Sequence, residues 1–431
     1  MPRPAADSQS PQTRVISLGC RLNIAEGEAM RLMAKRAGVD DCVIINSCAV
    51  THEAVRRTRQ TIRKARREKP GARIIVTGCA AQIDAQAFGA IEEVDAVIGN
   101  AEKMAPRTWA DLAAFDAAGQ TPVIVDDIMN ARETAAHLID GYGDRARAFL
   151  QIQNGCDHRC TFCIIPYGRG PARSVPPQDA VDAVNRLVDA GHKEVVLTGV
   201  DMTSWGADLG EGQQLGDLVG AILDGAPALF RLRLSSVDCA EIDAALFDRL
   251  VQDDRMAPHL HLSLQSGADL ILKRMKRRHN RGQAIRLAER LRARRPEISL
   301  GADFIAGFPT EDEAMFADTL GLIDDAGINF VHAFPFSPRK GTPAARMPQL
   351  DRRIIHERAA RLRAKASEAT RRFLDSLVGA EETGVIESGR RVRLGNFAAV
   401  SVVSLSEDAS GIARVRIDRR GGDQLRGSLV R

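Results

Sequence analysis

The chain has 431 residues, of which 44% are hydrophobic and 27% charged, and its formal net charge is +4. These proportions are those of a water-soluble globular protein of two or three domains. No stretch approaches the ~18–20 apolar residues of a membrane span, and Met1–Gln12 lacks the apolar core of a signal peptide. We therefore expect a cytoplasmic protein without membrane contact. Because the net charge is small, nucleic-acid binding would have to rest on local patches.

The N-terminal region alternates strands and helices. Residues 1–12 are expected to be a disordered tail, and residues 13–125 a first domain. Its predicted strands are Val15–Leu18, Val43–Asn46 and Ile74–Thr77, separated by helices such as Glu26–Ala37 and Ala54–Lys69. A βαβαβ series of this kind predicts a parallel sheet with right-handed crossovers.

A cysteine stands at or just after the end of each of these strands: Cys20, Cys48 and Cys79. The carboxyl ends of parallel strands meet at one edge of a sheet, and open α/β sheets bind ligands there. Three thiolates at this edge, with no fourth, suggest a three-cysteine iron–sulfur cluster. The alternative is that they are small core residues, which is our assignment for Cys42 at the start of its strand.

A linker is expected at residues 126–145, followed by a second domain at 146–373. Six strands separated by helices predict an open (β/α)6 barrel with its chemistry at the carboxyl ends of the strands. These strands are expected at Arg147–Ile152, Glu194–Gly199, Phe230–Ser235, His259–Leu264, Ser299–Ile305 and Asn329–Phe334. A long basic helix, Asp351–Phe373, closes the domain, and residues 374–431 are expected to form a small antiparallel β domain.

A second set of cysteines follows the first barrel strand: Cys156, Cys160 and Cys163, in the run NGCDHRCTFC. Thiolates are the soft ligands that a [4Fe-4S] cluster takes. Three of them leave one iron open, as in catalytic rather than structural metal sites. A zinc or disulfide site with the same spacing is the alternative. Cys239 is read as structural, with the active cavity as its other possible environment.

The C-x3-C-x2-C spacing resembles that of the radical S-adenosylmethionine (SAM) enzymes. From Thr13 onward the chain resembles the methylthiotransferases of that superfamily, which carry two clusters and a C-terminal TRAM-like domain. The resemblance is carried by SLGCRLN, NSCAVT, VTGCAAQ, GCDHRCTFCIIPYGRGPARS, VVLTGVD, HLSLQSG, DFIAGFPTE and FPFSPRKGTPAA.

The resemblance implies two [4Fe-4S] clusters, SAM as cofactor and tRNA as substrate, bound through its anticodon stem-loop. The branch acting on N6-threonylcarbamoyladenosine (t6A), to give its 2-methylthio derivative, looks most similar. The isopentenyladenosine branch and the branch acting on a ribosomal-protein aspartate are the alternatives. An electron donor such as flavodoxin or ferredoxin, and a sulfur source, are also implied. Further SAM contacts carried over from the family are Thr198, Gly199, Gln265, Ser266 and Gly307.

Two basic stretches suit an RNA partner: Arg56–Lys69 and Lys273–Arg278. Lys and Arg contacts to phosphates give affinity without sequence information. The role of Arg169 is left open between a phosphate and a carboxylate partner. A function of another class, a non-catalytic iron–sulfur protein that binds RNA or carries sulfur, also remains open at this point.

Overall fold

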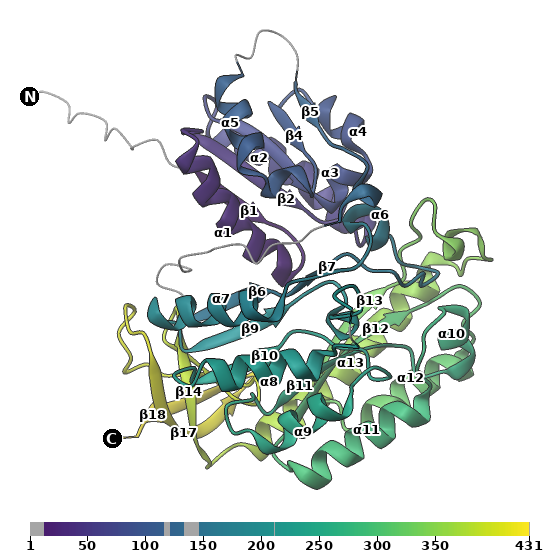
Figure 1. Cartoon of the computed structure of the whole chain (residues 1–431). Coiled ribbons are helices and arrows are strands. Elements are labelled where there is room, and N and C mark those ends of the chain that lie inside the picture. Colours follow the sequence, from purple (N-terminus) through teal and green to yellow (C-terminus); the bar gives the residue numbers. More distant parts are fainter. Residues whose placement is uncertain (1–12, 116–120, 133–145, 211, 431) are drawn as a thin grey trace, which may run out of the picture. The chain divides into compact units, whose positions relative to one another are not determined.

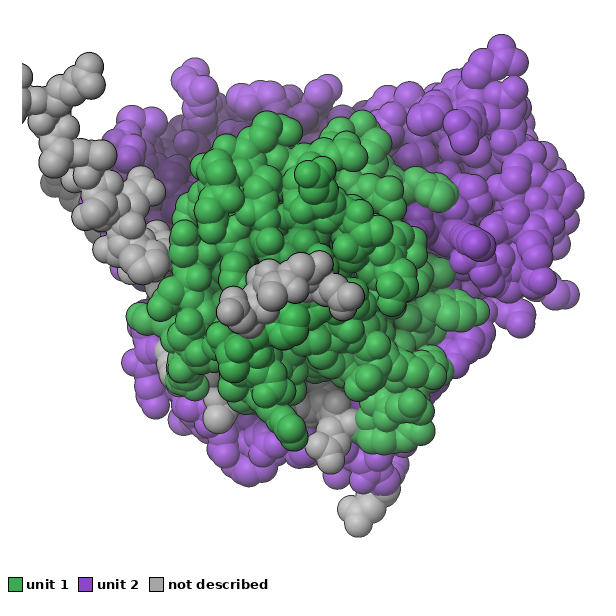
Figure 2. All heavy atoms as spheres, turned by 90° about the horizontal axis from the view of Figure 1, so that it is seen from above, with its two compact units in different colours: residues 1–132, 164–171 green, residues 133–163, 172–431 purple. Residues whose placement is uncertain are grey.

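The computed structural model describes residues 13–115, 121–132, 146–210 and 212–430. The chain forms two compact units (Figure 2). Unit 1 comprises residues 1–132 and 164–171, and unit 2 comprises residues 133–163 and 172–431. The expected tail, and the part of the expected linker from residue 133 to 145, lie outside the described residues. Unit 1 thus includes Ile164–Pro171, a segment that follows the second set of cysteines in the sequence.

Unit 1 contains a five-stranded parallel sheet in the order β1-β2-β3-β4-β5 (Figure 1). The strands are β1 (Arg14–Ser17), β2 (Cys42–Ser47), β3 (Arg73–Gly78), β4 (Ala96–Ile98) and β5 (Val123–Ile124). The sequence predicted the first three. The last two are only three and two residues long, which is too short to give a periodic signal.

Helices cover both faces of this sheet because β2 and β3 are apolar on both sides, as is typical of parallel strands. Ile44 and Ile75 pack with Met30 and Trp109 on one face, and Ile45 and Val76 pack on the other. The helices are α1 (Arg21–Arg36), α2 (His52–Glu68), α3 (Cys79–Ile83), α4 (Ala85–Gly89), α5 (Pro106–Ala114) and α6 (Ile165–Arg169).

Unit 2 contains six parallel strands in two three-stranded sheets, β10-β9-β6 and β11-β12-β13. A parallel bridge between Val237 and Leu262 links the two sheets. The strands are β6 (Arg147–Gln151), β9 (Glu194–Thr198), β10 (Arg231–Leu234), β11 (His259–Gln265), β12 (Ser299–Ala306) and β13 (Phe330–Pro335). All six expected strands are present, and their bounds differ from the expected ones by at most one residue at each end.

Helices alternate with these strands, as expected for (β/α) units (Figure 1). The main ones are α7 (Pro177–Asp189), α8 (Leu215–Gly225), α9 (Ala244–Gln252), α10 (Asp269–Arg274), α11 (Arg281–Arg294), α12 (Glu313–Asp325) and α13 (Arg352–Ser376). No helix among the described residues is long and apolar enough to cross a membrane.

The C-terminal segment of unit 2 closes into a small β-barrel in the order β14-β15-β16-β18-β17. Its strands are β14 (Glu381–Glu387), β15 (Arg391–Leu394), β16 (Ala399–Ser401), β17 (Ile412–Gly421) and β18 (Gln424–Leu429). The pairings are antiparallel, as predicted, except for β16 with β18, which is parallel.

Arginines of β10 hold this small barrel to the larger one. Arg231 donates to the carbonyl of Thr383 (3.0 Å), and Arg233 donates to that of Gly395 (2.9 Å). Both guanidiniums also pair with the fully buried Glu194 of β9. Burial alone would raise the pKa of Glu194, but Arg233, Arg147 and Arg231 outweigh it and hold that pKa at about 2.

Candidate metal centres

The three N-terminal cysteines follow three adjacent strands of unit 1. Cys20 caps the start of α1, Cys48 directly follows β2, and Cys79 is the first residue of α3 after β3. Since β1, β2 and β3 are neighbours and parallel, all three thiols lie at the carboxyl edge of the sheet. Cys48 and Cys79 are buried, whereas Cys20 is exposed.

Two glycines make this convergence possible. Gly19 and Gly78 have φ angles of 92° and 94°, a region that side chains rarely adopt. A Cβ on Gly19 would lie 2.8 Å from the Cys48 sulfur, and one on Gly78 would lie 2.4 Å from the backbone nitrogen of Ser47. Glycine is therefore required before both Cys20 and Cys79, since only its absent side chain lets the neighbouring strand approach.

The thiols influence one another electrostatically. Burial is the main cause that raises the pKa of the Cys48 thiol to about 11, and the Cys79 and Cys20 thiols add to the shift. A thiol with so high a pKa keeps its proton at neutral pH unless a cationic centre replaces that proton, and metal binding to cysteine releases protons in this way.

Arg169 of α6 lies against this triad and is 1% exposed. Its Nε donates to the Cys79 sulfur at 3.1 Å. Its two other nitrogens bind the Glu26 carboxylate, and Nη2 also donates to Asn23 Oδ1 at 2.6 Å. The missing side chain of Gly168 lets α6 approach Cys79, because a Cβ added at Gly168 would lie 3.1 Å from the Cβ of Cys79. Arg169 thus binds a carboxylate, one of the two partners that the sequence left open, and also contacts the thiol of Cys79.

A second buried cation completes this network. Lys103 is fully buried, and its Nζ lies 2.7 Å from Glu26 Oε2 and 2.6 Å from Asn100 Oδ1. Burial alone would raise the pKa of the Glu26 carboxyl, but Arg169 and Lys103 outweigh it and hold that pKa at about 2. The carboxylate is therefore charged at neutral pH.

The second triad lies on the loop after β6 in unit 2. Gly155, with a φ of 72°, starts the turn, and the short hairpin of β7 (Gln153–Asn154) with β8 (Arg173–Ser174) closes the base of the loop. Cys156, Cys160 and Cys163 are all partly exposed. Burial, followed by the charge of Asp201, raises the pKa of Cys156, and the thiols of Cys163 and Cys160 add to the shift.

Backbone contacts fix the middle of this loop. Thr161 accepts a hydrogen bond from the amide of Ala344 (2.8 Å), and its own amide and hydroxyl donate to the carbonyls of Met275 and Arg274. The side chain of Phe162 packs against a buried cluster that includes Phe308. The aromatic residue before Cys163 thus anchors the loop to the barrel.

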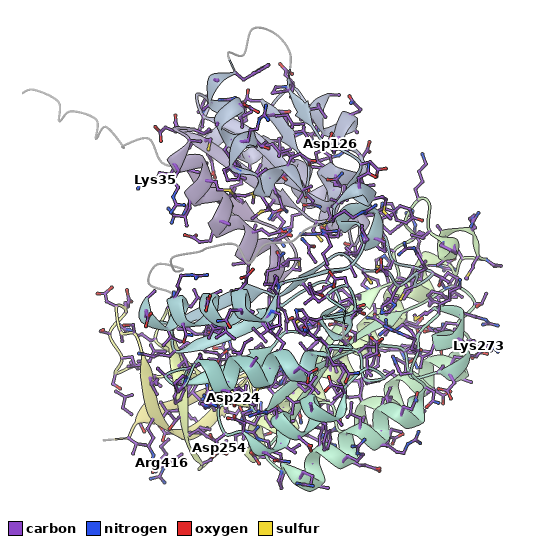
Figure 3. The ribbon with its side chains drawn as sticks, viewed as in Figure 1. Lys35, Asp126, Asp224, Asp254, Lys273 and Arg416 are labelled. Atoms are coloured by element: carbon purple, nitrogen blue, oxygen red, sulfur yellow. The ribbon has the colours of Figure 1, made fainter. Side chains whose placement is uncertain are left out.

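An arginine lies beside this triad as well. Arg277 donates to the Cys160 sulfur at 3.6 Å and to Asp238 Oδ2 at 2.8 Å. Arg277 belongs to the basic stretch Lys273–Arg278, for which the sequence predicts contact with RNA. That interpretation does not fit Arg277, whose side chain is only 9% exposed, although Lys273 is exposed and extends away from the ribbon (Figure 3).

Polar groups also surround Cys156. Its sulfur lies 3.6 Å from Asp201 Oδ2, which is 2.8 Å from His158 Nε2. Burial alone would raise the pKa of Asp201, but the hydrogen bonds from His158 and Ser204 lower it. The charged Asp201 therefore holds His158, which stands between Cys156 and Cys160 in the sequence, and so orders this part of the loop.

The chemistry of both donor sets fits a [4Fe-4S] cluster. Each triad presents three thiols that influence one another and lie next to an arginine. Thiolates are the ligands that such clusters take, and hydrogen bonds to the sulfurs are a normal part of their surroundings. The other two cysteines differ: Cys42 is buried at the opposite end of β2, and Cys239 is buried near Arg277.

The five expected SAM contacts lie at the carboxyl ends of barrel strands. Thr198 ends β9, and Gly199 follows it. Gln265 ends β11 with a φ of 67°, a strained conformation for a residue other than glycine. Ser266 is fully buried and bonds Thr319 and the amide of Ala268. Gly307 packs against Ile355 of α13, which fills the space that a side chain would occupy.

Two histidines and an aspartate that no sequence motif indicated form a cluster on one face of β11, β12 and β13. His261 and His332 both bond Asp303 Oδ1 at 3.0 Å. Gly301 leaves room for the His261 ring, since an added Cβ would lie 2.4 Å from its Nδ1. The signal was present as the alternation HLHLSLQ, which places polar side chains on one face of the strand.

A parallel-stranded (β/α) barrel with a three-cysteine loop after its first strand defines a radical SAM protein. The model of the radical SAM superfamily matches residues 150–323, and that of the uncharacterized protein family UPF0004 matches residues 12–99. The fold is similar to that of TsrM from Kitasatospora setae, a radical SAM methyltransferase, with a TM-score of 0.51 and 16% identity over 74% of this chain and 68% of that one.

Curated relatives match almost the whole chain. The threonylcarbamoyladenosine tRNA methylthiotransferase MtaB of Rickettsia prowazekii is 46% identical over 90% of both chains. MtaB of Bacillus subtilis is 35% identical over 83% of this chain and 80% of that one. The tRNA-2-methylthio-N(6)-dimethylallyladenosine synthase of Erythrobacter litoralis is 35% identical over 86% of both. The chain belongs to the radical SAM methylthiotransferase family, and it is an enzyme that uses SAM and iron–sulfur chemistry.

Proposed function

We propose that this enzyme converts t6A next to the tRNA anticodon to its 2-methylthio derivative, using two [4Fe-4S] clusters. The observation that carries the proposal is the presence of a three-cysteine site in each of two separate units. Relatives with 46% and 35% identity that bear the t6A name support the choice of substrate.

The reaction replaces hydrogen on an aromatic carbon, which offers no acidic proton to a side-chain base. When bound, SAM and an iron–sulfur cluster supply radical chemistry for such a carbon, while the protein provides position and electrostatics. In this proposal Cys156, Cys160 and Cys163 hold the cluster that binds SAM. Cys20, Cys48 and Cys79 hold the second cluster, which serves sulfur insertion.

Further residues of unit 2 have supporting roles. Thr198, Gly199 and Gln265 contribute to the SAM pocket at the carboxyl ends of β9 and β11. Ser266 and Gly307 support the wall of the SAM pocket and do not contact SAM directly, because their nearest partners are the protein residues Thr319 and Ile355.

Helix α2 is our candidate for contact with tRNA phosphates. Only Thr58, Ile62 and Ala65 of this helix are buried, which leaves a face of exposed basic side chains. These are Arg56, Arg57, Arg59, Arg63, Lys64 and Arg67. A flavodoxin- or ferredoxin-type electron donor, a sulfur source and action in the cytoplasm complete the proposal.

The test compares nucleosides from tRNA of a strain lacking the gene with those of the same strain expressing wild-type protein or Cys160→Ala. Mass spectrometry should detect the 2-methylthio derivative of t6A only with the wild-type protein. If 2-methylthio-isopentenyladenosine appears instead, the substrate assignment is wrong. If the tRNA of all three strains is identical and a ribosomal-protein aspartate is modified, the tRNA assignment itself is wrong.

A further inference from the structure

The cluster of His261, Asp303 and His332 lies on the inner face of the larger barrel in unit 2. The opposite face of β11 and β12 is apolar and fully buried, with Leu260, Leu262, Leu300, Ala302 and Phe304. Since the helices of a (β/α) barrel form its outer ring, the apolar face is the outer one and the polar face the inner one. β13 is the last strand of its sheet, beside β12 (Figure 1). The cluster therefore reaches the edge of the sheet.

His332 is not needed to satisfy the buried part of this cluster. Asp303 Oδ1 already accepts a hydrogen bond from His261 Nε2 at 3.0 Å, and the His261 side chain is only 10% exposed. His332 Nδ1 donates a second bond to the same oxygen, although the His332 side chain is 55% exposed. Among the described residues, its other ring nitrogen, Nε2, has no hydrogen-bond partner. The ring is thus oriented by Asp303 and keeps one nitrogen available for a ligand.

The charge of Asp303 makes this orientation firm. Burial alone would raise the pKa of the Asp303 carboxyl, but the hydrogen bonds from His261 and His332 outweigh it and hold that pKa well below its usual range. The carboxylate accepts both bonds in its charged form, in which such bonds are strongest.

An aromatic side chain follows His332 on the same face. Phe334 is two residues further along β13 and is 38% exposed, and its ring centroid lies 6.4 Å from that of His332. β13 then ends at Pro335, so Phe334 lies between His332 and the carboxyl end of the strand. An exposed aromatic ring is a surface on which a nucleic-acid base can stack. A stacking ring beside an oriented histidine suits a modified base.

We propose that His332 binds the N6 substituent of the adenosine and thereby determines which modified adenosine the enzyme accepts, with Asp303 as its positioning residue. The inference rests on the proposed function, in which the substrate is t6A. The threonylcarbamoyl group carries a carboxylate, a hydroxyl and a carbonyl, all of which form hydrogen bonds with an imidazole. The isopentenyl group is a hydrocarbon and would leave His332 Nε2 unpaired when the bound base covers it. A site built for hydrogen bonding rejects such an analogue strongly.

The spacing along the strands agrees with this substrate. The methylthio group enters at C2 of the adenine, whereas the substituent stands on N6, at another position of the ring. His332 pairs in register with Asp303, and Gly307, beside the proposed SAM pocket, follows four residues later in the chain. Four residues of a strand span about 13 Å. The base would therefore lie over Phe334, with C2 toward the SAM pocket and the substituent at His332.

The experiment compares two anticodon stem-loop RNAs that differ only in the N6 substituent, one with t6A and one with isopentenyladenosine. The full chain is reconstituted anaerobically, and the Kd of each RNA is measured by fluorescence anisotropy at one salt concentration, because phosphate contacts are common to both RNAs. Wild type is compared with His332→Ala and His332→Gln. His356→Ala is the matched control, since His356 is an exposed histidine on α13 of the same unit.

The preference between the two RNAs is the decisive quantity. Wild type should bind the t6A RNA about 30-fold more tightly, the size expected for a hydrogen bond that involves a charged group. His332→Ala should lose most of this preference by weakening the binding of the t6A RNA alone, and kcat/KM for its methylthiolation should fall by a similar factor through KM. His332→Gln keeps a group that forms hydrogen bonds and should retain part of the preference. A purely structural role would weaken both RNAs equally.

The outcomes separate this inference from the proposed function. An unchanged preference in His332→Ala, or a loss of preference in His356→Ala, would overturn the inference alone. A wild-type enzyme that methylthiolates only the isopentenyladenosine RNA would overturn the proposed function and the inference with it. Iron content equal to that of wild type shows that a variant is folded and loaded, and His332→Gln provides the same test if His332→Ala does not fold.

Discussion

The two cysteine triads are built in different ways. In unit 1 the three cysteines come from three strand ends far apart in the sequence, and Glu26, Lys103 and Arg169 form a buried ionic network beside them. In unit 2 the three cysteines lie within one loop, and all are partly exposed. Each triad has one arginine on one sulfur, but Arg277 is paired with Asp238, whereas Arg169 shares its carboxylate with a second cation.

This difference between the triads fits two different roles in the reaction. A loop with partly exposed ligands leaves access for a cofactor that must bind and leave at every turnover, as SAM does. A site assembled from rigid strand ends around a buried positive charge holds its ligands in one arrangement. This difference is consistent with the proposal that unit 2 is the site of SAM cleavage and unit 1 the site that holds sulfur for transfer.

Loss of a unit 2 ligand should have the largest effect. Cys160→Ala should abolish formation of 5′-deoxyadenosine and of methylthiolated tRNA. The cluster that binds SAM needs all three thiolates to stay bound to the protein. Chromatography of reaction products with mass detection measures both. Cys239→Ala, which changes a buried cysteine of the same unit, should keep both activities. If Cys160→Ala still cleaves SAM, the assignment of the unit 2 triad is wrong.

Loss of a unit 1 ligand should separate the two activities. Cys48→Ala should still form 5′-deoxyadenosine but yield no methylthiolated tRNA, because the unit 2 site remains intact. The matched control is Cys42→Ala, at the other end of the same strand, which should retain both. Methylthiolated tRNA at the normal level from Cys48→Ala would contradict a role of unit 1 in sulfur insertion.

The backbone of unit 1 provides a third test. Gly78→Ala should destabilise unit 1 by roughly 3 kcal/mol, because the φ of 94° is unfavourable for alanine and the added Cβ would meet the Ser47 backbone. Gly38 has a similar φ of 74°, but a Cβ added there would have no atom within 4 Å. Gly38→Ala should therefore lower the free energy of unfolding by only about 1 kcal/mol. Urea unfolding of the metal-free protein distinguishes them, and equal costs would show that Gly78 is not needed for close approach.

Acid should destabilise each unit, because it protonates one buried glutamate in each. Glu26 and Glu194 have folded-state pKa values of about 2, against an ordinary value of 4.5. A depressed pKa contributes stability above pH 4.5 that is lost as the pH falls from about 4.5 to about 2. Each carboxylate should therefore account for about 2 kcal/mol of loss between pH 7 and pH 3. Urea midpoints at these two pH values test this, and unchanged midpoints would contradict it.

Much of this architecture could be predicted from the sequence because its signals are local. Apolar runs such as Val43–Asn46 give parallel strands, and cysteines placed after such runs give a common edge. The loop of Cys156, Cys160 and Cys163 is contained in one short motif. The strands β4 and β5 could not be predicted, since they are too short to show a period.

The partners of the cysteines could not be predicted either. Arg169 is 143 residues from Glu26, and Arg277 is 117 from Cys160, so only the fold brings them together. Arg277 stands in a basic stretch that is typical of a solvated surface. Arg277 is buried because it contacts Asp238 and Cys160. These residues are too far from it in the sequence for a local pattern to predict the contacts.

Iron and sulfide content after anaerobic reconstitution tests the central claim, that each unit holds its own cluster. Three chains are compared: wild type, a variant with alanine at Cys20, Cys48 and Cys79, and a variant with alanine at Cys156, Cys160 and Cys163. The account predicts about eight irons per wild-type chain and about four in each variant. About four in the wild type, unchanged when the unit 1 cysteines are replaced and absent when the unit 2 cysteines are replaced, would contradict it.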